Sequence, residues 1–268
     1  MSFERSHLRL KYKRIRQSYA WVIEPLQQLS AIAVLILFWH FSIPLFNINS
    51  AIFPQPVEVV EAIFDNQSEL LAETMVTLKG VAGGLLIGSI IGFIVGLFSF
   101  YSSVFKNTVY PPLIGVGIAP KIAFAPIIVL WLGSGLNSAV ALAALIVFFP
   151  VLVNTYDGFQ NINRDIIMMA ESFGASKWFL FWRVRIPNAT PHLMIGAKLG
   201  VVFAFIGAVV AEFIASGSGM GYLITSYTTY GQTASAFAGV VVITLVSLVG
   251  YLIVDLIDRK YFVWYENN

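Results

Sequence analysis

Long apolar stretches, separated by short polar segments, follow one another along most of the chain. Each is about as long as the roughly 20 residues that a helix needs to cross the apolar core of a membrane. Six such stretches can be distinguished, at about 26–46, 73–100, 105–132, 137–156, 188–215 and 236–257. The pattern therefore predicts an all-α integral membrane protein with about six transmembrane helices.

A polar and aromatic segment, residues 163–191, separates the fourth stretch from the fifth and is far longer than a turn between two helices requires. Apolar residues recur in its first part at spacings of 3, 4 and 7, which is typical of one face of a helix. These apolar residues are Ile166, Ile167, Ala170 and Phe173, and the basic residues of the segment are Arg164, Lys177, Arg183 and Arg185. We interpret the segment as a docking surface for another protein.

A glycine divides this segment into two short helical patterns. Gly174 stands where a C-cap glycine ends a helix, and Ser176 can cap the helix that follows. Pro187 then begins the next apolar stretch, as proline does in the first turn of a helix. The sequence thus predicts a short helix, a turn at Gly174 and a second short helix before the fifth span.

Composition agrees with a membrane protein and excludes several other classes. Charged residues make up 11% of the chain, against about 25% in a soluble domain, and the mean hydropathy is +0.80. The net charge of +2 is too small to indicate nucleic-acid binding. There is no cysteine, and His7, His40 and His192 are too scattered for a metal site. Nucleic acid, disulfides and a metal centre are therefore not expected.

The sixteen Lys and Arg residues are unequally distributed between the two sides that six spans would define. Six lie in the N-terminal tail, four in the segment 158–187 and two at the C-terminus, whereas the three loops on the opposite side contain none. Because cytoplasmic segments of membrane proteins are enriched in Lys and Arg, we expect both termini and the docking segment in the cytoplasm. The chain divides into a basic tail (1–25), a transmembrane domain (26–262) and a C-terminal tail (263–268).

The second stretch carries a glycine at every fourth position. Such a stripe of small residues lets another helix approach closely, so we expect a helix-packing face, with a role in lining a pathway as the alternative. The glycines are Gly80, Gly84, Gly88, Gly92 and Gly96.

The third stretch contains four prolines, and Lys121 lies between the last two of them. Each proline removes a backbone donor, and broken backbone at membrane depth is tolerated only inside protein or beside water. This span therefore either lines a pathway or is a merely kinked helix, and Lys121 is a candidate pathway residue. The prolines are Pro111, Pro112, Pro120 and Pro126.

Two ionisable residues, Lys198 and Glu212, lie within the fifth stretch. A charge near the bilayer centre costs about 2.5–3.5 kcal/mol on insertion scales, so both are candidates for a pathway or gate, with interhelical packing as the alternative. They are separated by about 21 Å along a helix and cannot pair with each other. The glycine-rich segment 217–222 follows. Because no strand is expected before it, we do not interpret it as a nucleotide-binding motif, and we predict a turn in an outer loop, about 216–235.

Several short motifs between residues 50 and 262 resemble, in their order and spacing, the permease subunits of binding-protein-dependent ABC importers of the nitrate, sulfonate, taurine and bicarbonate branch. The resemblance implies a type I ABC importer permease fold with a cytoplasmic coupling helix, in the inner membrane of a bacterium. The motifs are Thr77-Leu78-Lys79-Gly80, Pro120-Lys121-Ile122-Ala123, Leu130-Trp131-Leu132-Gly133, Phe149-Pro150, Asn154-Thr155, Gly174-Ala175-Ser176, Ile186-Pro187, Ala211-Glu212 and Gly219-Met220-Gly221-Tyr222.

The coupling loop of that family carries a motif called EAA: Glu-Ala-Ala, three residues, Gly, nine residues, and Ile-x-Leu-Pro. Here Gly174 is followed by nine residues and Val184-Arg185-Ile186-Pro187, which puts Met168 at the position of the glutamate. Glu171 is not in register to replace it. By resemblance, the residues that couple the chain to an ATPase are Asp165, Ala170, Ser172, Phe173, Gly174, Ala175, Ser176 and Pro187.

The same resemblance implies the partners of the chain: a second permease copy in a homodimer, two cytoplasmic ATP-binding subunits and an extracytoplasmic solute-binding protein. The sequence itself contains no Gly-Lys pair, and hence no G-x-x-x-x-G-K-[ST] phosphate-binding loop. We therefore expect ATP and Mg to bind the partner ATPase, and the chain to be a transport subunit without enzymatic activity of its own.

The expected cargo is a small solute, and a sulfonate-, taurine- or nitrate-like anion is favoured because Lys79, Lys121 and Lys198 lie within spans. A thiamine-precursor or riboflavin-like heterocycle, which relatives of this branch also transport, is the alternative. An ion-coupled secondary carrier is the alternative from another class, although such carriers often pair two broken helices and only the third span is clearly broken here. A membrane-bound enzyme is the third possibility, for which no catalytic set of residues is present.

Overall fold

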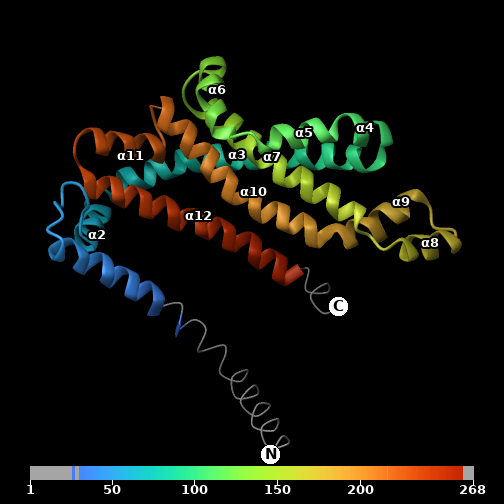
Figure 1. The fold of residues 1–268 in the computed structure, drawn as a ribbon, viewed down its shortest axis with the longest axis horizontal. Coiled ribbons are helices and arrows are strands. Elements are labelled where there is room, and N and C mark those ends of the chain that lie inside the picture. Colours follow the sequence, from blue (N-terminus) through green and yellow to red (C-terminus); the bar gives the residue numbers. More distant parts are fainter. Residues whose placement is uncertain (1–25, 28–29, 216, 262–268) are drawn as a thin grey trace, which may run out of the picture.

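A computed structural model of the chain describes residues 26–27, 30–215 and 217–261, and all regular elements in this part are helical (Figure 1). In chain order they are Ser30–Leu45, α2 (Pro56–Asp65), α3 (Gln67–Tyr101), α4 (Ser103–Thr108), α5 (Tyr110–Ile118), a 3-10 turn (Lys121–Phe124), α6 (Ala125–Leu132), α7 (Leu136–Gln160), α8 (Arg164–Ser172), α9 (Lys177–Phe179), a π-helical turn (Leu180–Arg185), α10 (Ile186–Ala215), α11 (Met220–Thr229) and α12 (Thr233–Tyr261). The all-α membrane fold predicted from the sequence is thereby confirmed.

The long helices extend between two ends of the molecule. Figure 1 shows α8 and α9 together at one end, and α2 and α11 at the other. We call these the α8 end and the α11 end. The helices α3, α7, α10 and α12 span most of the distance between them, so these two ends are the parts of the described structure that would project toward the two sides of a membrane.

Four helices are long and apolar enough to cross a membrane: Gln67–Tyr101, Leu136–Gln160, Lys177–Ile214 and Thr233–Lys260. A fifth span is formed if α5 and the segment Lys121–Leu132 are counted together, and these meet at an angle of 89°. The first of the six expected spans is represented by the apolar helix Ser30–Leu45, while residues 28 and 29 lie outside the described part. The structure thus supports four or five spans among the described residues, where the pattern predicted about six.

The glycine stripe of α3 lies against α7. A Cβ atom added at Gly88 would be 2.6 Å from the carbonyl oxygen of Ala144, and one at Gly92 would be 2.7 Å from that of Phe148. Real Cβ atoms do not approach a carbonyl oxygen so closely, so the two backbones are in direct contact at these turns. All five glycines of the stripe, Gly80, Gly84, Gly88, Gly92 and Gly96, are buried.

Small residues also bring α10 close to α7. A Cβ atom at Gly207 of α10 would lie 2.5 Å from the Cα of Ala143, and one at Gly158 of α7 would lie 2.9 Å from the Cβ of His192. Beside the first of these contacts, Leu142 of α7 is fully buried in the main apolar cluster. The three helices α3, α7 and α10 therefore form one tightly packed unit, as small-residue contacts do in membranes.

Three features differ from the sequence-based expectation. The outer loop expected at 216–235 contains a ten-residue helix, α11, whose side chains Leu223 and Tyr227 are buried. The second span begins at Gln67, earlier than the expected 73, and the fifth continues back to Lys177 because the π-helical turn joins α9 to α10. The expected spans end at polar residues, and the helices of the structure continue through these residues.

The short helix α2 packs on α12 through small side chains. Val59 and Ala62 are buried against Ala238 of α12. Its larger apolar residues Val57 and Phe64 are exposed, which suits contact with lipid at the membrane surface.

Candidate functional site

The α8 end of the molecule carries the helix–glycine–helix arrangement predicted from the sequence. The side chain of Asn163 accepts a hydrogen bond from the backbone N–H of Asp165 at 2.8 Å and caps α8. After α8, Gly174 adopts φ +78°, a left-handed conformation that glycine enters without strain. Ser176 then accepts a hydrogen bond from the N–H of Phe179 at 3.2 Å and caps α9. The turn is thus defined by capping at both sides.

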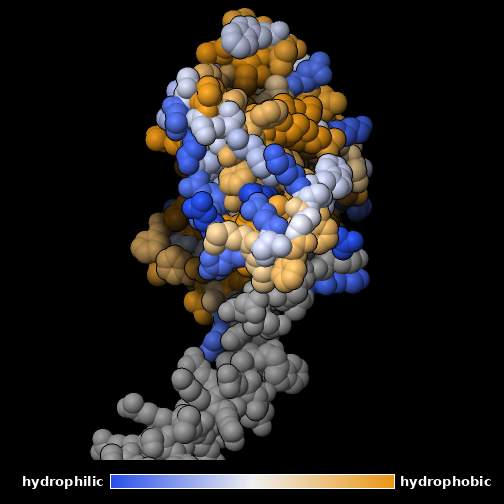
Figure 2. All heavy atoms as spheres, turned by 90° about the vertical axis from the view of Figure 1, so that its right-hand side faces the viewer, coloured by the Kyte–Doolittle hydropathy of each residue, from blue (hydrophilic) through white to orange (hydrophobic). Residues whose placement is uncertain are grey.

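Large apolar side chains of this turn are exposed. Phe173 has 85% of its surface exposed and Trp178 has 73%, and both methionines that occupy the first two positions of the EAA register are more than half exposed. We define the α8 surface as Met168, Met169, Phe173 and Trp178. Figure 2, which looks at the α8 end, shows hydrophilic and apolar residues intermingled there. Exposed apolar side chains in such number mark a surface that contacts another protein or the membrane.

The other coupling residues expected from the sequence lie around this surface. Asp165, Ser172, Gly174 and Ser176 are exposed, whereas Ala170, Ala175 and Pro187 are half-buried. Phe173 was expected on the same face as Ile166, Ile167 and Ala170, but those three are half-buried while Phe173 is exposed. Phe173 is the C-cap residue, and the backbone there already departs from the helix.

A continuous helix connects the turn at Gly174 with the interior of the bundle. The segment Lys177–Ile214 forms a single span of 38 residues. Near its start, the guanidinium carbon of Arg185 lies 5.1 Å from the ring centre of Phe100 on α3, a cation–π contact. The rings of Phe181 and Phe159 stack at 6.0 Å. The part that follows the α8 surface is therefore packed against both α3 and α7.

Glu212 lies in a hydrogen-bonded junction at the α11 end. Its Oε2 accepts the hydroxyl of Thr77 and the N–H of Gly221, each at 2.9 Å, and only 3% of the residue is exposed. Thr77 in turn accepts the N–H of Met220 at 2.8 Å, and Glu73 accepts the N–H of Gly219. Glu212 therefore joins α10, α3 and the start of α11, in the interhelical role that was the alternative to a gate.

The turn before α11 requires glycine at this junction. Gly219 has φ +98°, and a Cβ there would collide with the carboxylate of Glu212. A further contact is made by Tyr227 of α11, whose hydroxyl donates to Glu69 of α3 at 2.7 Å. Burial and the neighbouring carboxylate raise the pKa of Tyr227, which keeps the phenol protonated as a donor. The glycine-rich segment is thus a structural turn.

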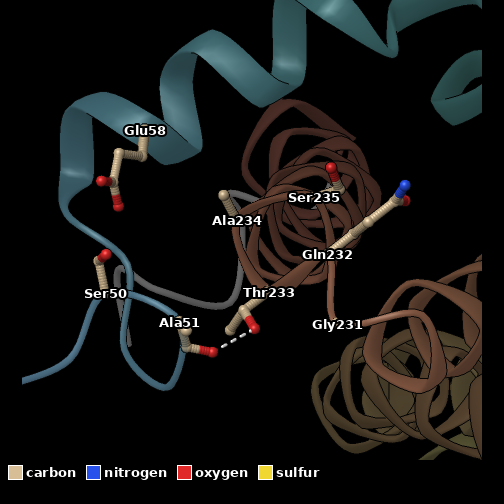
Figure 3. A pocket seen from close by; sticks show the side chains of 8 residues that line it. All are labelled: Ser50, Ala51, Glu58, Gly231, Gln232, Thr233, Ala234 and Ser235. Atoms are coloured by element: carbon tan, nitrogen blue, oxygen red, sulfur yellow. Dashed lines mark hydrogen bonds between the residues drawn. The ribbon is translucent and has the colours of Figure 1, made fainter.

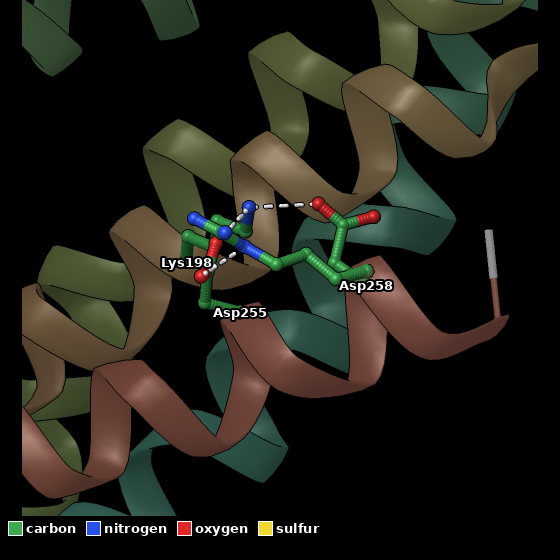
Figure 4. Close-up of polar contacts among 4 residues, drawn as sticks. Lys198, Asp255 and Asp258 are labelled. Carbon is green, nitrogen blue, oxygen red and sulfur yellow. Dashed lines mark hydrogen bonds and ion pairs between the residues drawn. The ribbon is translucent and has the colours of Figure 1, made fainter. Parts of the chain in front are cut away.

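Lys198 is paired with two acidic residues that the sequence analysis did not connect with it. Its Nζ lies 2.7 Å from Asp255 Oδ1 and 2.7 Å from Asp258 Oδ2, both on α12 (Figure 4). Asp255 falls inside the predicted sixth span, and its position there was a signal that could have identified it. The pairing neutralises Lys198.

Lys121 lies at the break between α5 and α6. Its ammonium group donates a hydrogen bond to the carbonyl of Gly117 and lies 4.7 Å from the ring centre of Phe149. A carbonyl and an aromatic face leave the positive charge of Lys121 formally uncompensated at this contact. Lys121, Lys198 and Glu212 thus have separate partners, and the structure does not bring the three candidates into one site.

A polar cavity of about 410 Å³ opens at the α11 end, where the loop before α2 meets the start of α12 (Figure 3). The hydroxyl of Thr233 donates to the carbonyl of Ala51 across it at 2.6 Å. Glu58 also lines the cavity and accepts the N–H of Gln55 at 2.8 Å, as part of a capping box on α2. These contacts fix the loop on α12 and account for the polar character of the cavity.

Comparison with known proteins identifies similar chains. The family described as "Binding-protein-dependent transport system inner membrane component" matches residues 84–263. The formylaminopyrimidine transport permease protein ThiX of Halalkalibacterium halodurans is 30% identical over 232 residues, 86% of this chain and 92% of ThiX. The putative aliphatic sulfonates transport permease protein SsuC of Bacillus subtilis is 30% identical over 254 residues, 93% of this chain and 90% of SsuC.

A solved structure supports the same architecture. A chain from inward-facing conformations of the MetNI methionine ABC transporter matches with a TM-score of 0.56. The match covers 77% of this chain and 97% of that chain, at 16% sequence identity. At this identity the likeness shows the fold alone, which is that of a type I importer permease.

Proposed function

Because the chain belongs to the family of binding-protein-dependent transport system inner membrane components, and is thus a permease of an ABC transporter, we propose that its α8 surface docks into a separate ATP-binding subunit that drives import of a small solute. The observation that carries the proposal is the exposed apolar α8 surface at the start of a 38-residue transmembrane helix. Family membership also argues against the ion-coupled carrier that the sequence left as an alternative.

The chemistry of the α8 surface suits a short helix held in a groove. Recognition of a helix in a groove relies on a few apolar anchors on one side of it, and aromatic residues and methionine are enriched in the cores of protein interfaces. Phe173 and Trp178 supply the aromatic anchors, and Met168 supplies a flexible thioether where the family motif has a glutamate. The groove of the partner is therefore expected to be apolar opposite Met168, and not to present a basic residue for a glutamate.

The distribution of charge supports a cytoplasmic position for the α8 end. The described basic residues at this end are Lys106, Arg164, Lys177, Arg183, Arg185, Arg259 and Lys260. At the opposite end, α2 contains three acidic residues, and neither α2 nor α11 contains Lys or Arg. By the positive-inside rule the α8 end faces the cytoplasm of a cell whose inner membrane holds the protein. The N-terminal tail, 1–25, lies outside the described residues, and its six basic residues support the same orientation.

The proposed mechanism transmits motion from α8 along one helix. A displacement of α8 by the closing ATPase dimer moves the helix Lys177–Ile214 against α7, to which it is closely packed. The 89° break between α5 and α6 gives a neighbouring span that can change its angle. Two copies of the chain form the path between them. ATP favours one conformational state of the complex only because its affinities for the two states differ.

We further propose an anionic cargo delivered by an external solute-binding protein. Lys198 is neutralised by Asp255 and Asp258, so of the three lysines in the spans Lys79 and Lys121 are left to attract an anion. The aliphatic sulfonates named for SsuC are solutes of this kind. The formylaminopyrimidine named for ThiX, a thiamine-precursor-like heterocycle, supports the second candidate, a neutral heterocycle.

Docking is tested by substituting one exposed aromatic residue at each end of the molecule. Phe173→Asp places a charge in the α8 surface, and Tyr230→Asp makes the same type of change at the α11 end, where Tyr230 is 78% exposed. The ATP-binding subunit is expected to co-purify with the Tyr230→Asp variant and to be lost from Phe173→Asp. Equal retention of the ATPase by both variants would refute the docking role.

A further inference from the structure

A cluster of four charged side chains joins α10 to α12. The ammonium group of Lys198 lies between the carboxylates of Asp255 and Asp258, at 2.7 Å from each. Asp255 also accepts a hydrogen bond from Nε of Arg259 at 2.8 Å. Figure 4 shows the lysine reaching from α10 toward both aspartates, which lie on successive turns of α12. We call these four residues the Lys198 cluster.

The cluster lies where α12 is weakly attached to the rest of the bundle. Only 6% of the most apolar window of α12 is buried, against 50% for α7. At the α11 end, α12 is packed against α2 through Ala238 and against α11 through Gly239. Further along, Gly250 lies against Phe205 of α10, and the Lys198 cluster follows one to two turns later. The cluster therefore fixes the position of the α8-end part of α12 relative to α10.

Stability alone gives no reason for charges at this contact. Two basic and two acidic side chains balance one another, and a largely buried ion pair can often be replaced by apolar residues without loss of stability. Lys198, Asp255 and Asp258 are 20%, 13% and 10% exposed in their side chains. Apolar residues could not, however, reproduce the arrangement of the charges. One amine has two carboxylate acceptors, three residues apart on one helix.

We propose that Asp255 and Asp258 form a two-position track for Lys198, along which α10 slides against α12 when the transporter changes state. The two carboxylates are displaced along the helix by about 4.5 Å, at 1.5 Å per residue. Sliding of packed helices by a few ångströms is a common form of conformational change. At either limit of such a movement the ammonium keeps one carboxylate, so Lys198 is never left without an acidic partner. Lys198, Asp255 and Asp258 are positioning residues in this account.

The inference rests on the proposed function, because the movement begins at the α8 surface and reaches Lys198 through the helix Lys177–Ile214. Lys198 is twelve residues beyond Ile186, the first residue of α10, which is about 18 Å along the helix axis. A displacement of α8 that moves this helix along its own axis shifts Lys198 directly relative to α12. The track then defines how far α10 travels.

Single removal of each carboxylate tests the track. Asp255→Asn leaves Lys198 paired only in the state that uses Asp258, and Asp258→Asn leaves it paired only in the state that uses Asp255. The two substitutions are therefore expected to shift the equilibrium between states in opposite directions. Since a single residue on a coupling route changes coupling by roughly 2- to 30-fold, one variant should raise and the other should lower the rate of Mg-ATP hydrolysis by the complete transporter by such factors.

Two further variants separate the track from simple packing. Arg259→Gln removes a contact of Asp255 that does not involve Lys198, and Arg259 is 70% exposed; its hydrolysis rate should stay near that of the wild type. The triple variant Lys198→Met, Asp255→Asn, Asp258→Asn removes all three charges of the track together, so it should fold and bind the ATPase while its response to the binding protein is reduced by a similar factor.

The outcomes distinguish this inference from the proposed function. Failure of the wild-type chain to bind an ATPase would contradict the proposed function itself. If the ATPase binds all variants, and Asp255→Asn and Asp258→Asn change hydrolysis in the same direction, or the triple variant responds as the wild type does, the track is refuted and the cluster is only a structural contact. Melting temperatures of all variants, measured in the same detergent, identify any change caused by loss of folding.

Discussion

The hydroxyl of Thr77 on α3 lies 2.9 Å from the carboxylate of Glu212 on α10 and at the same time accepts the backbone N–H of Met220 at the start of α11. One side chain of α3 thereby connects this helix with α10 and α11, whose contact residues lie 135 and 143 positions later in the sequence. Both residues are almost completely buried. The position of α11 relative to the α3–α7–α10 unit depends on this junction, which also explains why a segment of mixed polarity forms an ordered helix there.

Replacing Thr77 by Val should markedly lower the stability of the folded protein. The substitution keeps the shape of the side chain but removes the hydroxyl, which leaves the N–H of Met220 without its acceptor and the buried carboxylate of Glu212 with one donor fewer. An unsatisfied buried group costs about 1–3 kcal/mol, so the unfolding temperature of the purified protein should fall clearly. Thr77→Ser, which retains the hydroxyl, should lose much less.

A matched control for this substitution lies on α12. Thr244 is exposed and donates its hydroxyl only to the carbonyl of Val240 in its own helix. Thr244→Val should therefore change stability by less than about 0.5 kcal/mol. Similar melting temperatures for Thr77→Val and Thr244→Val would show that the junction does not stabilise the fold.

The glycine stripe predicts a sharp contrast between two glycine-to-alanine substitutions. Gly88→Ala would bring a methyl group to 2.6 Å from the carbonyl oxygen of Ala144, whereas Gly115 has no atom within 4 Å of an added Cβ. Overpacking of this kind costs typically about 1–3 kcal/mol. Gly115→Ala should instead be neutral or gain up to about 1 kcal/mol from helix propensity. Thermal unfolding of the two variants measures the difference, and equal stabilities would contradict the close contact of α3 with α7.

The orientation of the chain can be measured by thiol labelling, since the natural sequence contains no cysteine. Trp178→Cys introduces a single thiol at the α8 end, and Tyr230→Cys introduces one at the α11 end; both residues are more than 70% exposed. A membrane-impermeant maleimide added to intact spheroplasts should label the thiol at position 230 and not that at 178. Inside-out vesicles should give the reverse. Labelling at 178 in intact spheroplasts would place the α8 end outside and contradict the proposed docking.

The features that the sequence predicted correctly depend on local signals, namely prolines and helix-capping residues. A break in the third span follows from its prolines, because each removes a backbone hydrogen bond wherever the helix lies. The turn at Gly174 follows from the preference of a helix C-terminus for glycine and of a helix N-terminus for serine, and both caps are present. Such signals act over a few residues, so they can be recognised in the sequence without knowledge of the tertiary structure.

The features that the sequence did not predict depend on tertiary contacts. The pairing of Lys198 with Asp255 joins residues 57 positions apart, and neither residue indicates the other in the one-dimensional pattern. The helix α11 was mistaken for a loop because it is short, polar and preceded by glycines, and its burial comes from contacts with α3, α10 and α12. Phe173 was expected on the same helix face as Ile166, Ile167 and Ala170, but it is the C-cap residue of α8, where the backbone leaves the helix and the side chain is exposed.

The contact between the α8 surface and an ATP-binding subunit can be observed directly by photo-crosslinking. A benzophenone amino acid is incorporated in place of Phe173 in one sample and in place of Tyr230 in another, and membranes are irradiated with and without ATP. We expect a crosslink from position 173 to the ATP-binding subunit and none from position 230. Absence of any crosslink from position 173, in membranes where the complex is shown to assemble and transport, would contradict this contact.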